Sequence, residues 1–392
     1  MSKVTIFSLI LFLAACTTVG PAQTSTPPKP TTSPSAVSVE VEIFPPTSSP
    51  EPEIEISEPT ATLPPATYYF FEPGVNPLTG LPVADVENLS RRPVMIKVSN
   101  WPREGRPHAG LTSADIVFEY FIGHQMNRFL AIYYGENAEV IGPVRSGRLV
   151  DAQLVNLYQG ILAYGNADPQ VDQVLIDELG ERAMAFNALP CPPMCGVSTY
   201  DATGVFVDSG AMSAFADSMG VENDRPDLRG MYFQDDLSKW DAPGELLHVE
   251  YADFSIMQWH YNSESGSYHL WMEAQTDAGL ILMPMLDRNN VQPVEFDNLV
   301  VMYAEYIEFA SSLHDIVIRD SAGYQPALLF RDGKTTYGAW RVPEADRPII
   351  FETPEGKPLP LKPGKTWVVI VGLQSRTQQL PDGEWEIYFG LP

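Results

Sequence analysis

The chain has 392 residues, and 50 acidic against 24 basic side chains give it a net charge of −26 at neutral pH. A chain this acidic is not expected to bind nucleic acid, which requires a basic surface. The charge is unevenly spread, because residues 91–148 carry 8 basic and 5 acidic side chains whereas residues 149–310 carry 5 and 26.

The N-terminus has the pattern of a lipoprotein signal peptide over residues 1–15. Lys3 precedes an apolar stretch over residues 4–13, which is too short to cross a bilayer as a helix. Leu13-Ala14-Ala15-Cys16 resembles the lipobox of bacterial lipoproteins, and the resemblance implies that Cys16 is lipidated. We therefore expect an exported protein, anchored to a membrane through Cys16 on the extracytoplasmic side. An ordinary signal peptide with an incidental cysteine is the alternative.

Residues 16–72 are expected to form a disordered tether. Twelve prolines lie between Pro21 and Pro65, and large apolar side chains are few. Such a segment cannot bury enough apolar surface to offset the entropy lost on ordering. The tether would hold the folded part of the chain away from the membrane.

Residues 73–235 are expected to form a mixed α/β domain. Runs rich in β-branched and aromatic residues predict strands, and apolar residues at helical spacing predict helices. Asp168-Pro169 predicts a helix start, with an N-cap followed by proline at the first helical position. Strands are predicted over 93–98, 114–122, 128–134, 140–144 and 161–164, and helices over 149–158, 169–179 and 203–219.

Residues 245–392 are expected to form a mainly antiparallel β domain, after a polar, turn-rich boundary over 224–243. In one of its strands, Trp259 and His260 should face opposite sides of the sheet. The predicted fold class is therefore α+β. Strands are predicted over 247–254, 256–261, 268–273, 299–307, 315–319, 327–330, 338–342, 349–352 and 366–371.

Cys191 and Cys195 form the remaining pair of cysteines once Cys16 is assigned to the anchor. In an oxidising compartment, two cysteines this close in sequence are expected to form a disulfide. A metal site is the alternative, but two thiolates without a nearby pair of histidines make only half of a zinc site. We predict a structural disulfide and no metal site.

The candidate binding site is the segment Gly142-Pro143-Val144-Arg145-Ser146-Gly147-Arg148. Guanidinium groups hold phosphate or carboxylate through paired hydrogen bonds, and the helix expected after this segment begins with unpaired N–H groups. We therefore expect the segment to bind an anion. The residues expected to form the site are Arg145, Ser146, Arg148, Arg128, Arg106 and Asn100.

Asp115 and Glu119 are expected to face the same side of one strand, as the ion-pair partners of the arginines. A structural ion-pair network of this kind, which Asp151 could also join, is the alternative to anion binding. A catalytic carboxylate pair is a further reading of Asp115 and Glu119. The histidines show no metal-binding spacing, and no nucleophile, phosphate-binding or dinucleotide motif occurs. We predict no catalytic residue and no cofactor.

The chain resembles the YerB-like lipoprotein family over about residues 73–372. The resemblance is weak between residues 180 and 290, and the residues at 165–168 and those after Leu380 depart from the family pattern. It implies a membrane-anchored, two-part extracytoplasmic protein without an agreed activity. The motifs that carry it are Pro77-Leu78-Thr79-Gly80-Leu81-Pro82, Arg92-Pro93-Val94, Arg106-Pro107, Gly110-Leu111, Ala114-Asp115-Ile116-Val117-Phe118-Glu119, Arg128-Phe129-Leu130-Ala131-Ile132, Ile141 to Arg148, Asp332-Gly333-Lys334, Gly338-Ala339-Trp340 and Leu361 to Trp367.

The sequence therefore favours a membrane-anchored binding or scaffolding lipoprotein of the cell envelope. Its expected partners are the membrane, through Cys16, and an anionic small molecule or cell-wall polymer. The alternative is an envelope enzyme that acts on phosphate- or sugar-bearing substrates.

Overall fold

A computed structural model describes residues 65–198, 204–236, 240, 242–321 and 323–391 of the chain. The expected signal peptide, Cys16 and the tether up to residue 64 lie outside the described residues. Residues 68–71 pack on the folded body, because the ring of Tyr69 stacks on Tyr232 at 4.3 Å and Phe71 contacts Phe233 at 6.2 Å. Among the described residues, no helix is long and apolar enough to cross a membrane.

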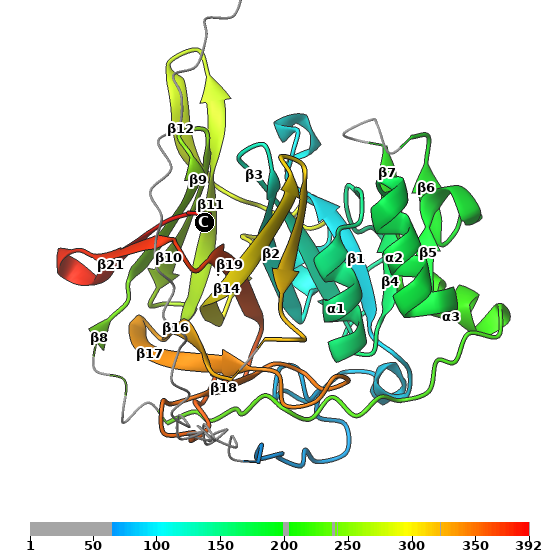
Figure 1. Cartoon of the computed structure of the whole chain (residues 1–392), viewed down its shortest axis with the longest axis horizontal. Helices are drawn as coiled ribbons and strands as arrows, with labels where there is room; N and C mark the ends of the chain where they lie inside the picture. The colour runs from blue at the N-terminus through cyan, green and yellow to red at the C-terminus, as the bar shows by residue number, and fades with distance from the viewer. Residues whose placement is uncertain (1–64, 199–203, 237–239, 241, 322, 392) are drawn as a thin grey trace, which may run out of the picture. The chain divides into compact units, whose positions relative to one another are not determined.

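The larger of two main sheets has twelve strands and contains segments from both expected domains (Figure 1). Its strands are apolar and buried on both faces at the centre, as expected for a sheet covered on both sides. In order across the sheet they are β18 (Ile350–Glu352), β17 (Lys334–Arg341), β16 (Gln325–Arg331), β14 (Asn298–Ala310), β19 (Thr366–Gly372), β2 (Ile116–Gly123), β3 (Met126–Tyr133), β1 (Val94–Ser99), β4 (Ile161–Tyr164) and β5 (Ala183–Ala185), while β15 (Leu313–Val317) pairs with β14 and β8 (Ala242–Pro243) with β17.

Strand β19 joins the two parts of this sheet. It runs parallel to β14 on one side and parallel to β2 on the other. A strand from near the C-terminus is therefore inserted beside one from the first third of the chain. The division into domains at 73–235 and 245–392 stays a prediction.

The smaller sheet packs against the larger one through aromatic side chains. The ring centroids of Trp259 on β10 and Trp367 on β19 lie 4.8 Å apart, and both rings are fully buried. His260 is only partly buried, so it faces away from Trp259 as predicted. The sheet contains β12 (Gly279–Pro284), β11 (Ser267–Thr276), β10 (Ser255–Asn262), β9 (Leu246–Ala252), β21 (Glu384–Tyr388) and β20 (Arg376–Gln379), with β13 (Glu295–Phe296) paired to β11.

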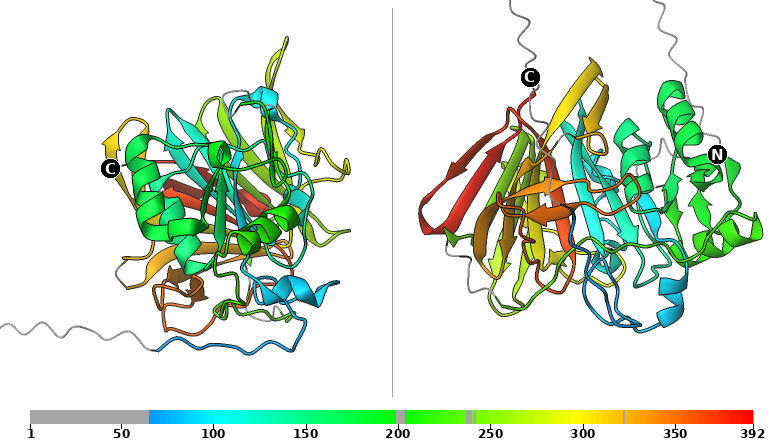
Figure 2. Two further views of the ribbon diagram at one scale, coloured as in Figure 1. Left: turned by 90° about the vertical axis from the view of Figure 1, so that its right-hand side faces the viewer. Right: turned by 60° about the horizontal axis from the view of Figure 1, so that its bottom comes forward.

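The helices gather around β1, β4 and β5 (Figures 1 and 2). They are α1 (Leu149–Leu157), α2 (Pro169–Leu179) and α3 (Ser209–Ser218). Helix α2 begins as predicted, because the Asp168 side chain accepts a hydrogen bond from the N–H of Gln170. Short 3₁₀ helices cover Val86–Ser90, Arg103–Gly105, Leu111–Ser113, Gly180–Arg182, Phe186–Ala188 and Pro381–Gly383.

Two element predictions are wrong. Helix α3 begins at Ser209, not near residue 203, because Asp208 caps it and the β-branched segment before it forms strand β7 (Val205–Val207), paired with β6 (Met194–Gly196). The run over 140–144 forms isolated bridges in place of a strand, among them Ile141 with Val207. The α+β fold class, with a largely antiparallel C-terminal part, is confirmed.

Candidate anion-binding site

Three buried polar side chains meet between the larger sheet and α1. The Lys97 ammonium on β1 lies 2.9 Å from a carboxylate oxygen of Asp151 on α1. The Tyr120 hydroxyl on β2 accepts a hydrogen bond from Lys97 and donates one to Asp151. All three residues are 0% exposed, so water does not reach their polar groups.

Arginines from two nearby segments surround this trio, and we call Arg128, Arg145, Ser146 and Arg148 the arginine cluster. Arg128 on β3 donates to the carbonyl of Ser146 at 3.0 Å, and Arg148 donates to the carbonyl of Gly147 at 2.8 Å. The Nε atoms of Arg128 and Arg148 are buried and have no hydrogen-bond partner among the described residues. Arg145 donates to the hydroxyl of Ser99 at 3.3 Å.

Burial and the neighbouring positive charges lower the pKa values of Arg128 and Lys97. Burial, followed by the charges of Arg148 and Arg145, holds the pKa of Arg128 well below its usual value. Burial lowers the pKa of Lys97 to about 7, although the nearby Asp151 carboxylate opposes that shift. The guanidinium groups of Arg128 and Arg148 and the amine of Lys97 thus lie near the carboxylate of Asp151, an arrangement in which a bound anion would be stabilised.

Local sequence explains why the cluster forms here. At Gly147 a Cβ atom would lie 2.7 Å from a terminal methyl group of Leu175, so the loop passes close to α2 at this residue. Asp151 then closes the start of α1, because its carboxylate accepts from the backbone N–H of Arg148 at 2.7 Å. The Ser146 hydroxyl donates to the Asn166 side chain at 2.5 Å, which ties the loop to the turn before α2.

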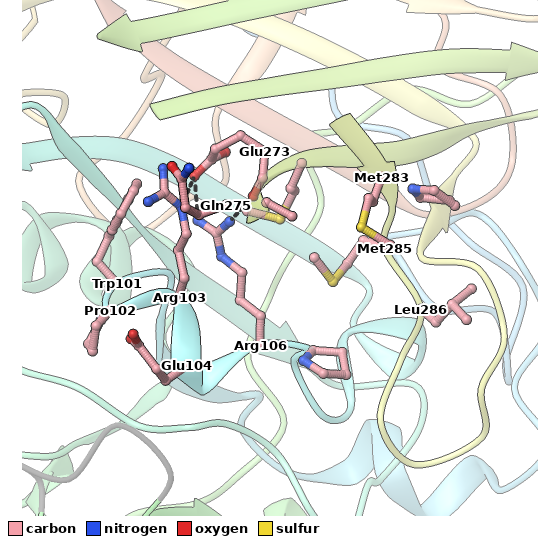
Figure 3. Close-up of a pocket in the computed structure, with 14 residues that line it drawn as sticks. Trp101, Pro102, Arg103, Glu104, Arg106, Glu273, Gln275, Met283, Met285 and Leu286 are labelled. Atoms are coloured by element: carbon pink, nitrogen blue, oxygen red, sulfur yellow. Dashed lines mark hydrogen bonds and ion pairs between the residues drawn. The ribbon is translucent and has the colours of Figure 1, made fainter. Parts of the chain in front are cut away.

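Arg106 and Asn100 contact a different set of residues. Arg106 pairs with Glu273 at 3.0 Å and donates to the Asn100 side chain at 3.0 Å. Asn100 in turn donates to Asn127 at 2.6 Å. These contacts lie apart from those of the arginine cluster, and Arg106 lines a pocket beside β12 (Figure 3).

Asp115 and Glu119 do not pair with arginines among the described residues, contrary to the prediction. Asp115 accepts from the backbone N–H groups of Tyr134 at 2.7 Å and Gly135 at 2.9 Å. Glu119 accepts from the Trp367 indole at 2.7 Å and from Asn127 at 2.7 Å. Burial raises the pKa of Asp115 to about 6 and that of Glu119 to about 7. Backbone and neutral donors therefore take the place of the expected guanidinium groups.

Sequence reasoning missed Lys97 and Tyr120, and it named Asp151 only as an alternative partner. A usable signal exists at Lys97, because a charged residue interrupts an otherwise apolar run over residues 94–98. Lysine is almost never fully buried unless it is paired, so a lysine in a central strand indicates a buried partner.

Cys191 and Cys195 form a disulfide, with Cα atoms 4.8 Å apart, which joins the loop before β6 to the strand itself. Among the described residues, no group of three or more histidine, cysteine, aspartate or glutamate side chains is placed to hold a metal ion.

Comparisons with known proteins agree with this architecture. Residues 78–189 match the description "Protein of unknown function (DUF3048) N-terminal domain", and residues 247–368 match the corresponding C-terminal domain. A protein of Bacillus subtilis (strain 168) named "Putative lipoprotein YerB" is 26% identical over 307 residues, which cover 75% of this chain and 85% of that protein.

A crystal structure of the YerB protein from Bacillus subtilis superposes with a TM-score of 0.61 at 25% identity, over 76% of this chain and 96% of that chain. The resemblance predicted from sequence motifs is therefore confirmed. Every member of the arginine cluster lies within the residues matched by the N-terminal domain.

Proposed function

Because the chain belongs to the DUF3048 family of proteins of unknown function, we propose a function from its own site: it is a membrane-anchored extracytoplasmic lipoprotein that binds a small anionic ligand at the arginine cluster. One observation carries the proposal. Arg128, Arg148 and Lys97 lie near the carboxylate of Asp151, and the Nε atoms of the two arginines are buried without a hydrogen-bond partner among the described residues.

The chemistry of the cluster favours phosphate or carboxylate groups. Guanidinium groups donate paired hydrogen bonds to these anions, and charged hydrogen bonds are stronger than neutral ones. Arg128 is 7% exposed, and its Nε atom has no hydrogen-bond partner among the described residues, so its positive charge is poorly compensated by water. A small anion, free or carried by a component of the cell envelope, would supply that compensation.

Lipid anchoring is supported by Leu13-Ala14-Ala15-Cys16 and by the name of the Bacillus subtilis relative, "Putative lipoprotein YerB". Replacing Cys16 with serine is expected to release the protein from the membrane or leave it as precursor, since no other thiol is placed for lipid attachment. Membrane fractionation and lipid labelling measure this. The matched control replaces Cys191 and Cys195 with serine, which leaves Cys16 in place and should leave the protein on the membrane. A Cys16→Ser variant that still fractionates with membranes would exclude the anchor.

Anion binding is tested by thermal unfolding of Arg145→Gln and Arg148→Gln with and without phosphate. Phosphate should raise the melting temperature of the wild type more than that of either variant. Removing one charged donor is expected to weaken binding by about 1.5–3 kcal/mol. Arg376→Gln is the matched control, because Arg376 is exposed on β20 and lies over the Tyr388 ring instead of in the cluster.

Phosphate also stabilises proteins by exclusion from their surface, so sulfate and chloride are compared at equal ionic strength. Phosphate that raises the melting temperature of the wild type and of Arg145→Gln by the same amount would mean that no specific site exists. The arginines would then form only a structural network.

An envelope enzyme acting on phosphate- or sugar-bearing substrates is the second candidate. The observation in its favour is that the pKa of Lys97 is lowered to about 7, close to the value that suits a general base. Lys97 and Tyr120 are, however, 0% exposed, which keeps them from touching a substrate in this conformation and favours binding over catalysis.

A further inference from the structure

The edge of β17 that faces away from β16 is only partly paired (Figure 1). Lys334 and Thr335 pair there with β8, and residues 339–341 pair with β18. Between them, residues 336–338 have no strand partner on that side in the part of the chain that the structure describes. An unpaired edge offers backbone N–H and C=O groups to other molecules. Because β8 and β18 close the gap at both ends, it suits a compact polar ligand better than an added strand.

A pocket of about 560 Å³ lies at this gap. Thr336 and Tyr337 of β17 form part of its lining. The remaining lining residues come from the start of the described chain, from the segment before β8 and from the loop after β18. A pocket of this volume is typical of a site for a small molecule.

A buried arginine holds two walls of this pocket together. Arg331 is 1% exposed, and its guanidinium group donates to the backbone carbonyls of Gln234 at 2.5 Å and Asp235 at 3.1 Å. The same group donates to the carbonyl of Pro360 at 3.4 Å, in the loop after β18. The walls are therefore in place before a ligand arrives, which reduces the entropy that binding costs.

Aromatic rings give the pocket flat apolar surfaces. Tyr337 is 67% exposed, and its ring contacts the buried ring of Trp385, with centroids 5.8 Å apart. Tyr69 and Tyr232 line another part of the pocket and stack on each other, with centroids 4.3 Å apart. Each of these rings is positioned by a neighbouring ring, so it can cover an apolar face of a ligand with little further ordering.

Polar side chains lie beside these rings. The Tyr232 hydroxyl donates to the side-chain oxygen of Gln234 at 2.8 Å, an arrangement that leaves the NH₂ group of Gln234 to donate to a ligand. Asp236 and Glu355 add carboxylate acceptors to the lining, and Lys357 adds one ammonium group. Carboxylates therefore outnumber the ammonium group, which gives an anionic ligand no advantage here.

We propose that this pocket, between Tyr337 and the loop after β18, binds an uncharged oligosaccharide. A sugar ring has C–H groups on its faces, which pack on aromatic rings, and hydroxyl groups around its edge, which form hydrogen bonds with amides, carboxylates and backbone groups. An apolar ligand would leave those polar groups without partners. The pocket shares no residue with the arginine cluster, so the inference does not rest on the proposed function.

The experiment is isothermal titration calorimetry of the full-length chain with tetrasaccharides of glucose and of N-acetylglucosamine. The detergent is a polyoxyethylene, because a detergent with a sugar head group would compete for the pocket. At least one tetrasaccharide should bind with a Kd below about 1 mM. Tyr337→Ala should weaken that binding about tenfold or more, whereas Tyr337→Phe keeps the ring and should bind nearly as well as the wild type.

Phe309→Ala is the matched control, because Phe309 is an exposed aromatic residue on β14 that does not line the pocket. It should leave the Kd unchanged. Chemical denaturation should show that all three variants unfold like the wild type, since both positions are mainly exposed to solvent. A lower affinity of Tyr337→Ala then reports the loss of the ring and not a loss of folded protein.

Three outcomes would overturn the proposal. One is that neither tetrasaccharide binds to the wild type with a Kd below about 1 mM. Another is equal binding by Tyr337→Ala and the wild type. The third is a polyproline peptide that binds more tightly than both tetrasaccharides and loses affinity in Tyr337→Ala, because aromatic-lined grooves also bind proline-rich segments and the occupant would then be a peptide.

Discussion

Replacing Asp151 with asparagine is expected to lower the free energy of unfolding by about 3–5 kcal/mol, because it leaves a buried positive charge without its partner. Asp151 is the carboxylate that faces Lys97 and the arginine cluster, and both members of the ion pair are 0% exposed. Asparagine has nearly the same size and can still accept the hydrogen bond from the Arg148 N–H. The substitution therefore removes the charge and keeps the cap of α1.

The measurement is chemical denaturation, with Asp177→Asn as the matched control. Asp177 lies exposed on α2 and accepts a hydrogen bond from Gln173, so its loss should change stability by less than about 0.5 kcal/mol. A double variant with Lys97→Met and Asp151→Asn should recover part of the loss, because it removes both charges. A loss from Asp151→Asn no larger than that of the control would contradict a charged, buried pair.

The same pair predicts the direction of a pH effect. The pKa of Lys97 is lowered to about 7 from an ordinary value of 10.5, so the folded state binds fewer protons than the unfolded state between these values. The free energy of unfolding of the wild type should therefore increase as the pH rises from about 7 to 10.5, and this contribution of Lys97 is lost as the pH falls to 7. Above pH 7 the amine is neutral, so the cost of Asp151→Asn should be smaller there than below pH 7.

Sequence patterns predicted where the strands lie along the chain better than they predicted which strands pair with each other. The strand over residues 366–371 was predicted from its apolar residues, and its actual bounds are Thr366–Gly372. Nothing local to that segment indicates that it lies between β2 and β14, since each of these pairings joins residues far apart in the sequence. Which strands pair depends on all the strands of the chain together, and the residue pattern of one strand does not show it.

The same reason explains the mixed result at the site. Arg128, Arg145, Ser146 and Arg148 were predicted together, and the structure brings them together because Arg128 reaches the carbonyl of Ser146. Glu119 was assigned to the arginines because opposite charges attract. Its main donor, Trp367, lies 248 residues away along the chain, where no spacing rule connects the two.

Replacing Trp367 with alanine is expected to cost about 3–5 kcal/mol of stability, the usual range for a buried tryptophan. The ring is 0% exposed on β19, and it touches Phe129 at 4.9 Å and Phe296 at 5.3 Å. The substitution removes packing between the two sheets and the donor to Glu119. Chemical denaturation of the full-length chain measures the sum of the two losses.

Trp367→Phe separates the hydrogen bond from most of the packing. The pKa of Glu119 is raised to about 7 by burial, and the Trp367 indole holds it lower than burial alone would. Because the folded pKa is raised, the stability that Glu119 contributes is present below its unfolded value and is lost as pH rises through about 7. Without the indole donor, the charged carboxylate has one hydrogen bond fewer, so Trp367→Phe should be more destabilising above pH 7 than below it.

Trp385→Phe is the matched control, because the buried Trp385 donates to the uncharged carbonyl of Pro243 at 3.0 Å. Its loss should not depend on pH over this range, and a Trp367→Phe variant that behaved the same way would show that Glu119 does not change its protonation state near pH 7 in the folded chain.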